Sequence, residues 1–319
     1  MSTYHIHHVT RYLYPSTVID CTNQLMLYPV NDNLQLVKNH ELKISGDPPI
    51  ELFRDYFGNT VGMFSLVKPH TELKIVSDIE VSTSPVESPT DETAADTQWS
   101  ELFSLCENYP YIDFLQQEVF AGSSEIEEML EMITGRDKTI LENAQVLNEH
   151  VYKNFKYEKG VTSVVTKVDE ILKLKAGVCQ DFAHVLLVFL RMLEIPARYV
   201  SGYICPKNHE LRGEGATHAW VEAYIPNYGW LGLDPTNNCI VSDRHVRLAI
   251  GRNFSDCTPV KGTYKGSSEH TLEVSVTIEN GVPRLEKEEI APVFSYVVHN
   301  PGVQDNSYRR FMEMQQQQQ

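Results

Sequence analysis

A nearly all-apolar run at residues 185–193 limits what this chain can fold into more than any other feature of its sequence. On a helix, these side chains would cover almost the whole circumference, so the helix has to be buried in the centre of the protein. Gly177 permits a sharp turn before the run, Asp181 suits the first turn of a helix, and Pro196 ends the pattern. We therefore predict a central buried helix.

Cys179 lies in the first turn of this predicted helix. The positive end of the helix dipole and the unpaired N–H groups there favour a thiolate over a thiol, and the thiolate is the nucleophilic form of cysteine. A lone cysteine beside an apolar helix is nevertheless most often a small buried hydrophobic residue. The choice between these two interpretations depends on residues farther along the chain.

A predicted hairpin downstream brings a histidine and a carboxylate to the same end of a sheet. Residues 217–225 alternate as a strand, 226–229 supply turn residues, and 230–235 return antiparallel. His218 opens the first strand and Asp234 closes the second, although the sequence fixes neither the turn type nor the register. A nearby carboxylate orients an imidazole and stabilises its charged form.

Cys179, His218 and Asp234 are therefore a candidate Cys-His-Asp triad. The thiolate would attack an acyl carbon, the histidine would carry the proton to the leaving amine, and the aspartate would fix the tautomer of the imidazole. The N–H at the start of the helix, which we expect to be that of Cys179, would donate to the oxyanion. Taken singly, His218 and Asp234 would more often be structural residues at a strand end and a turn.

Charge and cysteine spacing narrow the range of partners. The chain has 43 Asp and Glu residues against 27 Lys and Arg, a net charge of -16 and no strong basic run, which argues against nucleic acid and anionic membranes. Its six cysteines are far apart without a CxxC pair, so we predict no disulfide framework, no metal site and no cofactor. We expect His5, His7 and His8 to be surface histidines. Because the chain has no signal-like start and no apolar run that could span a bilayer, we predict a cytoplasmic location.

Breaker residues and changes in composition divide the chain into four predicted parts. They are a small β-rich domain at 1–85, a linker at 86–97, a catalytic domain at 98–300 and a tail at 301–319 that we expect to be disordered. The catalytic domain starts with helices, predicted at 98–106, 111–120, 123–130, 138–155 and 168–174. A further strand at 271–278 could complete the sheet that contains the hairpin.

Four stretches of the chain resemble the core of the bacterial transglutaminase-like superfamily, whose members are often described as cysteine proteases. They are Gly-Val-Cys-Gln-Asp-Phe-Ala at 177–183, Ile-Pro-Ala-Arg-Tyr-Val-Ser-Gly-Tyr at 195–203, Thr-His-Ala-Trp-Val-Glu at 217–222 and Gly-Trp-Leu-Gly-Leu-Asp-Pro-Thr at 229–236. Residues 8–14 and 55–59 resemble the β-rich domain that precedes this core in the bacterial proteins. The resemblance implies a papain-like α+β fold, in which a central helix carrying the cysteine packs on an antiparallel sheet, with Cys179, His218 and Asp234 as the triad.

The resemblance leaves the outcome of the reaction open. Water would resolve the acyl-enzyme as a protease or amidase does, whereas an amine would give protein-glutamine transamidation; deamidation is a further outcome. We favour hydrolysis of a peptide or protein substrate, because water competes unless a site excludes it. From a different class, the chain could be a non-catalytic peptide-binding module, which would not need all three residues. Further candidates for oxyanion or substrate contacts are Tyr157, Gln180 and Trp220, and a packing role is as plausible for the ring of Tyr157.

Overall fold

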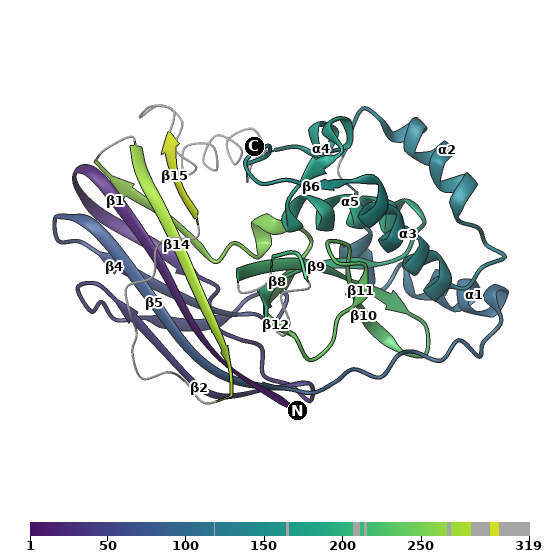
Figure 1. Ribbon diagram of the computed structural model, residues 1–319, viewed down its shortest axis with the longest axis horizontal. Coiled ribbons are helices and arrows are strands. Elements are labelled where there is room, and N and C mark those ends of the chain that lie inside the picture. Colours follow the sequence, from purple (N-terminus) through teal and green to yellow (C-terminus); the bar gives the residue numbers. More distant parts are fainter. Residues whose placement is uncertain are drawn as a thin grey trace.

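Two antiparallel sheets, one of them covered by helices, make up most of the protein in the computed structural model (Figure 1). The structure describes residues 1–117, 119–163, 166–206, 211–213, 216–266 and 269–281, and the backbone of 294–299. The predicted tail at 301–319 lies outside the described residues. No helix in the described part of the chain is long and apolar enough to cross a membrane.

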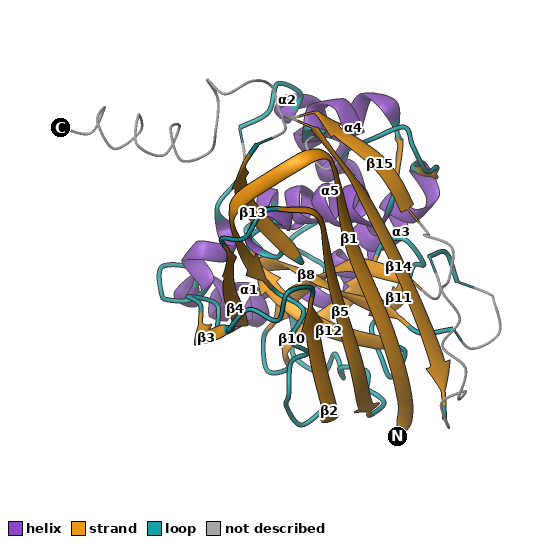
Figure 2. Ribbon diagram, turned by 90° about the vertical axis from the view of Figure 1, so that its left-hand side faces the viewer, coloured by secondary structure: helices purple, strands orange, loops and turns teal. Residues whose placement is uncertain are grey.

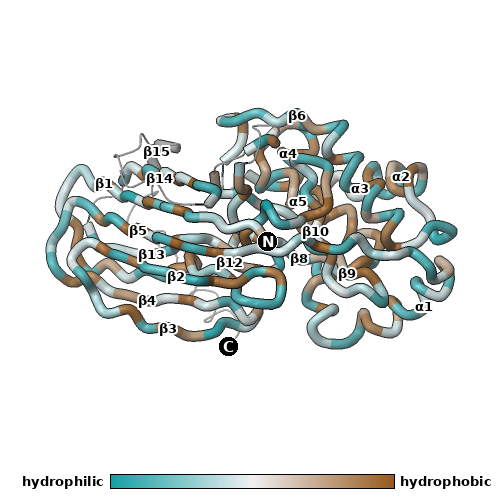
Figure 3. The backbone as a smooth tube through the Cα atoms, turned by 60° about the horizontal axis from the view of Figure 1, so that its bottom comes forward, coloured by the Kyte–Doolittle hydropathy of each residue, from teal (hydrophilic) through white to brown (hydrophobic). Residues whose placement is uncertain are grey.

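The larger sheet is built around one very long strand, β1. Residues 2–13 of β1 pair with β5 and β14, and after an irregularity its second half pairs with β4 and β13. The strands of this sheet are β1 (Ser2–Leu25), β2 (Gln35–Ile44), β3 (Glu51–Arg54), β4 (Thr60–Leu66), β5 (His70–Thr83), β13 (Val260–Lys265), β14 (Glu269–Asn280) and β15 (Phe294–His299). Hydropathy alternates along these strands (Figure 3), as expected for strands with one buried face. The predicted β-rich N-terminal region is confirmed.

The prediction that residues 271–278 complete the catalytic sheet is wrong. These residues belong to β14, which pairs antiparallel with β1 from Tyr4 to Leu13, and Figure 2 shows β14, β1 and β5 running side by side. An alternating pattern shows which face of a strand is buried, but it does not specify the strand with which it pairs. Part of the segment assigned to the catalytic domain therefore lies in the N-terminal sheet, while the proposed boundaries at 85, 97 and 300 stay predictions.

The smaller sheet carries the predicted hairpin. Its strands, in the order in which they pair, are β11 (Cys239–Ile240), β10 (Gly229–Asp234), β9 (Ala216–Ile225), β8 (Ala197–Ile204) and β12 (His245–Gly251). Helix α5 (Cys179–Met192) packs on β8 and β9, and α3 (Ile140–Asn154) and α4 (Val168–Leu174) pack on α5. The predicted fold, a central helix with the cysteine at its start on an antiparallel sheet, is confirmed.

Helix α5 is buried as its apolar sequence predicts. Val185, Leu186 and Leu190 are fully buried in the core between the helices and the smaller sheet. The one charged side chain in the run, Arg191, is also buried, and its guanidinium donates to the backbone carbonyls of Phe114, Gln116, Ala197 and Arg252. These bonds compensate the loss of water around the charge and tie the helix to three other segments of the chain.

Most of the predicted helices form, with one partial exception. Besides α3, α4 and α5, the predicted helices that form are α1 (Ala95–Leu105), which starts inside the predicted linker, and α2 (Ser123–Ile133). A short parallel pair of strands, β6 (Lys156–Tyr157) and β7 (Ala176–Gly177), precedes α5. The helix predicted at 111–120 is only the 3-10 turn η1 (Tyr111–Leu115). The carbonyls of Phe114 and Gln116 accept hydrogen bonds from Arg191, which takes the place of bonds within a longer helix.

Polar contacts join the two sheets. His8 in β1 is buried and its Nδ1 lies 2.8 Å from the hydroxyl of Tyr203 in β8, so the expectation of a surface histidine is wrong for this residue. Gln35 bonds to the backbone N–H and carbonyl of Arg247, and Asn59 does the same with Ile250. These contacts hold β12 against the larger sheet and thereby fix the first residue of β12, His245.

Candidate active site

The start of α5 is fixed by a buried carboxylate. Asp181 accepts the backbone N–H of Val178 at 2.7 Å and the hydroxyl of Thr162 at 2.6 Å, which places Cys179 as the first residue of the helix. Gly177 is required there, because a Cβ at that position would lie 2.4 Å from the Oδ2 atom of Asp181. Cys179 is half-buried and its side chain is a free thiol. A group at this position meets the unpaired N–H groups and the positive end of the helix dipole.

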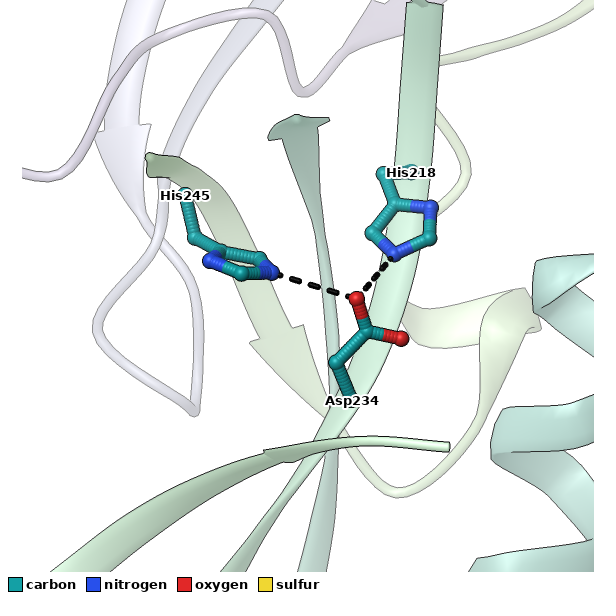
Figure 4. A group of neighbouring side chains, drawn as sticks. All are labelled: His218, Asp234 and His245. Atoms are coloured by element: carbon teal, nitrogen blue, oxygen red, sulfur yellow. Dashed lines mark hydrogen bonds and ion pairs between the residues drawn. The ribbon is translucent and has the colours of Figure 1, made fainter. Parts of the chain in front are cut away.

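The hairpin of β9 and β10 brings His218 and Asp234 together, as the sequence predicts. Nε2 of His218 lies 2.9 Å from Oδ2 of Asp234, and both side chains are fully buried (Figure 4). The other ring nitrogen, Nδ1, is buried, and among the described residues Cys179 is the side chain besides Asp234 that interacts with this ring by hydrogen bonding. Cys179 lies close enough to the ring to act on its pKa, so Nδ1 is the nitrogen available to the thiol.

Asp234 is held as a carboxylate by donors on both oxygens. Oδ1 accepts the backbone N–H of Thr236 at 2.9 Å, and Oδ2 accepts the side-chain amide of Asn237 at 2.7 Å in addition to His218. Burial alone would raise the pKa of Asp234, but His218 and His245 hold it well below its usual range. Asp234 is therefore ionised throughout the physiological pH range.

His218 is correspondingly held in its charged form. Burial acts to lower the pKa of His218, but the charge of Asp234, the hydrogen bond to it and the neighbouring thiol of Cys179 raise that pKa to about 10. An imidazolium next to a cysteine at a helix start stabilises the thiolate. The three groups together can therefore supply a nucleophile and a proton donor at neutral pH.

Tyr157 points toward the same space as His218. A methyl group added to Gly213 would meet Nδ1 of His218 at 3.5 Å and the hydroxyl oxygen of Tyr157 at 3.7 Å. Burial and the nearby Cys179 raise the pKa of Tyr157 to about 12, so its hydroxyl keeps its proton. Its ring also contacts Phe182 edge to face, with 6.2 Å between the ring centroids. Tyr157 is thus placed both to pack and to donate a hydrogen bond.

The other two candidates differ in exposure. Trp220 is fully buried, with its ring centroid 6.3 Å from that of His218 and 5.2 Å from that of His245. This position favours support of the two imidazoles over contact with a substrate. Gln180 follows Cys179 on α5 and is partly exposed. Roles for both residues in substrate binding stay predictions.

Two residues beside the triad candidates are missing from the sequence-based prediction, His245 and Asn237. Nε2 of His245, at the start of β12, lies 3.2 Å from Oδ2 of Asp234 (Figure 4). Asn237 contacts Asp234 and also accepts from the N–H of Arg212 at 2.7 Å. The Asn-Asn pair after the Asp-Pro turn is a signal for a capping amide, whereas nothing in the sequence links residue 245 to the hairpin.

The atoms of His218, Asp234 and His245 that meet here lie within 4.8 Å of one another, a spacing that could hold a metal ion. The hydrogen bonds from both imidazoles to Oδ2 of Asp234 account for this spacing without an ion. Two cavities of about 430 and 380 Å³ lie elsewhere, one between α3 and β10–β11 and one near α1, α2 and the end of α5. Neither is lined by a triad candidate, so neither identifies a substrate site.

Comparisons with known proteins support a single family. Residues 127–235 match the model of the transglutaminase-like superfamily, and residues 4–82 match the bacterial transglutaminase-like N-terminal region. An uncharacterized protein of Mycobacterium leprae (strain TN) is 31% identical over 280 residues, which cover 85% of this chain and 96% of the relative. A protein-glutamine gamma-glutamyltransferase of Pseudomonas aeruginosa is 38% identical over 73 residues, or 21% of this chain and 11% of that protein.

One solved structure supports the fold. A candidate cysteine protease from Cytophaga hutchinsonii superposes with a TM-score of 0.65 at 19% sequence identity, and the match covers 93% of this chain and 97% of the other. At this identity the likeness supports the fold alone. Taken with the match to the Mycobacterium leprae protein over most of both chains, it leads to one conclusion: the chain belongs to the transglutaminase-like superfamily and carries the N-terminal region of its bacterial members.

Proposed function

We propose that this protein is a cysteine-dependent acyl-transfer enzyme that acts on peptide or amide substrates through Cys179, His218 and Asp234. Members of its superfamily are generally enzymes. The observation that carries the proposal is the buried His218–Asp234 pair, whose remaining ring nitrogen is left for a cysteine at the start of a helix. A protein that only binds peptides would not need this charged, buried arrangement.

The proposed chemistry begins from an ion pair. Asp234 stabilises the imidazolium of His218, and the imidazolium stabilises the thiolate of Cys179. The thiolate attacks the carbonyl carbon of the substrate, the bond between that carbon and the amide nitrogen breaks, and the proton on Nδ1 of His218 passes to the leaving amine. In the second half, the oxygen of water or the nitrogen of an incoming amine bonds to the acyl carbon while His218 takes its proton. The bond between that carbon and the sulfur of Cys179 breaks, which restores the thiolate and the imidazolium.

Two donors are available for the oxyanion formed in these steps. The backbone N–H of Cys179 is among the first N–H groups of α5, which have no partner within the helix. The hydroxyl of Tyr157 is the second donor, because it keeps its proton at neutral pH and points toward the space beside His218. Each donor of this kind contributes most when it is fixed before the reaction, as a helix start is.

Hydrolysis is the preferred outcome, and amine transfer is the alternative. Water reaches any acyl-enzyme that a site does not shield, and no described residue marks a separate site for an amine. The name of the Pseudomonas aeruginosa relative favours transfer to an amine, but that relative matches over only 21% of this chain. The triad therefore supports acyl transfer as the reaction class. Whether water or an amine accepts the acyl group is a question for experiment.

The deciding experiment is product analysis on the purified protein. A library of glutamine-containing peptides is incubated with and without a primary amine, and masses distinguish cleavage, deamidation and amine incorporation. We expect cleavage or amide hydrolysis that disappears in Cys179→Ala. Efficient amine incorporation would replace hydrolysis by transamidation, and binding of peptides without any turnover would favour the non-catalytic peptide-binding module.

A further inference from the structure

We propose that His245 is a positioning residue of the triad: as a neutral imidazole it donates a hydrogen bond that holds the carboxylate of Asp234 in the orientation that His218 needs. This inference rests on the proposed function, because it assigns His245 a role in the same site. It adds a fourth residue from a strand outside the hairpin.

The contact between His245 and Asp234 is made across the sheet. Strands β8 and β9 lie between β10, which carries Asp234, and β12, which carries His245. Between β11 and β12, Val241 bonds to the backbone of Gly232, and a side chain on Gly232 would lie 2.5 Å from Cβ of Val241. The chain therefore passes close over β10 before it reaches His245.

Packing fixes the ring of His245. Its centroid lies 5.2 Å from that of Trp220 in an edge-to-face contact. Gly202 provides the space for this arrangement, since a Cβ there would lie 2.7 Å from the ring of Trp220 and 2.1 Å from the carbonyl oxygen of Val246. His245 also lines a small cavity of about 70 Å³, formed in part by Gln35. The ring thus has one defined orientation, with Nε2 toward Asp234.

Hydrogen bonding determines the tautomer of His245. The backbone N–H of Ser242 points at Nδ1 over 3.5 Å, so Nδ1 accepts and the proton resides on Nε2, from which it is donated to Asp234. Burial lowers the pKa of His245. The hydrogen bond to Asp234 and the charge of Asp234 act in the opposite direction without cancelling this effect, and His218 and Arg244 lower the pKa further, so it stays below its ordinary 6.5 and the ring is neutral at neutral pH. A neutral donor orients the carboxylate of Asp234 without forming a second ion pair with it, so the ion pair is the one between Asp234 and His218.

Oδ2 of Asp234 consequently accepts three hydrogen bonds from three different segments. They come from His218 on β9, Asn237 in the turn after β10 and His245 on β12. Without His245 the carboxylate would lose its donor from outside the hairpin and turn more freely about its side-chain bonds. Loss of this hydrogen bond should misalign the imidazole of His218 and lower the reactivity of Cys179 on the order of tenfold.

The test compares two substitutions in the full-length protein. His245→Gln keeps a side-chain N–H donor, whereas His245→Leu removes the donor and keeps an apolar side chain of similar size. The rate at which iodoacetamide alkylates Cys179 is measured from about pH 5 to about pH 9, together with thermal unfolding. We expect His245→Leu to lower the rate on the order of tenfold near neutral pH and His245→Gln to retain most of it. Equal rates in the wild type and His245→Leu, or equal losses in both variants, would overturn the proposal.

A second measurement reads the protonation of His245 directly in the wild-type protein. Two-dimensional ¹⁵N–¹H spectra of the histidine rings, with His245→Gln used to assign the signals, report the tautomer of each imidazole. We expect His245 to be neutral with its proton on Nε2 near neutral pH. A charged ring, a proton on Nδ1, or one zinc ion per chain whose removal changes these signals would contradict the positioning role. Neither measurement requires turnover of a peptide. A result that contradicts the positioning role of His245 is therefore distinguishable from a result that contradicts the proposed activity.

Discussion

Replacing Asp234 with asparagine tests how the site controls the charge of His218. In the wild type, burial acts to lower the pKa of His218, but Asp234 and Cys179 raise it to about 10. No carboxylate raises the pKa of His8, which is buried, or of His184, which is partly buried, and loss of solvation lowers the pKa of each to about 4. The Asp234→Asn change should therefore move the pKa of His218 from about 10 toward about 4.

This change would remove most of the imidazolium at neutral pH. A group with a pKa of about 10 is almost fully protonated near pH 7, whereas with a pKa of about 4 roughly one molecule in 1000 is protonated. If the imidazolium stabilises the thiolate, alkylation of Cys179 near neutral pH should slow by up to about 1000-fold, and turnover of peptides should fall with it. The variant keeps the shape of the side chain, so the effect is one of charge.

Alkylation followed by peptide mapping measures this rate, and thermal unfolding reports on the fold. Asp96→Asn is the matched control, since Asp96 is an exposed carboxylate at the start of α1, far from the site in the chain. We expect the control to react like the wild type. An Asp234→Asn protein that is folded and alkylated at the wild-type rate would refute the charge-based account of the site.

The same pair makes stability depend on pH in a defined direction. The pKa of His218 is raised above its ordinary 6.5, so its contribution is fully present below about pH 6.5 and is lost as the pH rises toward about 10. The pKa of Asp234 is lowered from its ordinary 3.8, so its contribution is present above about pH 3.8 and is lost as the pH falls further. The melting temperatures of Asp234→Asn and the wild type should therefore differ most between about pH 3.8 and about pH 6.5, where both contributions are present.

Three further substitutions test the oxyanion site, the start of the helix and the core. Tyr157→Phe should lower kcat about tenfold to a hundredfold with little change in KM, and equal values would assign Tyr157 to packing alone. Gly177→Ala forces Asp181 from its bond to Val178, so unfolding in denaturant should show a loss of roughly 1–3 kcal/mol, and an unchanged midpoint would contradict the required glycine. Arg191→Met leaves buried carbonyls unpaired and should cost roughly 3 kcal/mol in the same assay; a neutral effect would show that the surrounding chain relaxes.

The sequence allows prediction of the parts of the site that depend on local pattern. An apolar run of helix length identifies α5, and two alternating strands around an obvious turn bring His218 and Asp234 to one end of a hairpin. The apolar run and the alternating strands each lie within a few residues of the side chains whose positions they predict. The family resemblance concerns these same stretches, which is why the central fold agrees with the prediction.

The parts that sequence reasoning misses depend on contacts between distant segments. His245 reaches Asp234 only because β12 pairs with β8 at the far side of the sheet, and no local pattern encodes that pairing. In the same way β14 alternates like any half-buried strand, but its partner is β1, more than half the chain away. His8 is buried for a similar reason, because its face of β1 meets Tyr203.

The relative reactivity of the cysteines in the wild-type protein tests the central claim most directly. Limiting iodoacetamide is added slightly below neutral pH, and labelled peptides are quantified for Cys179, Cys21 and Cys106. Burial raises the pKa of both Cys21 and Cys106, so these thiols should remain largely unlabelled. If Cys179 is the nucleophile paired with His218, it should be labelled first and by a wide margin. Labelling of Cys179 no faster than Cys106 in the folded protein would contradict the triad and the function built on it.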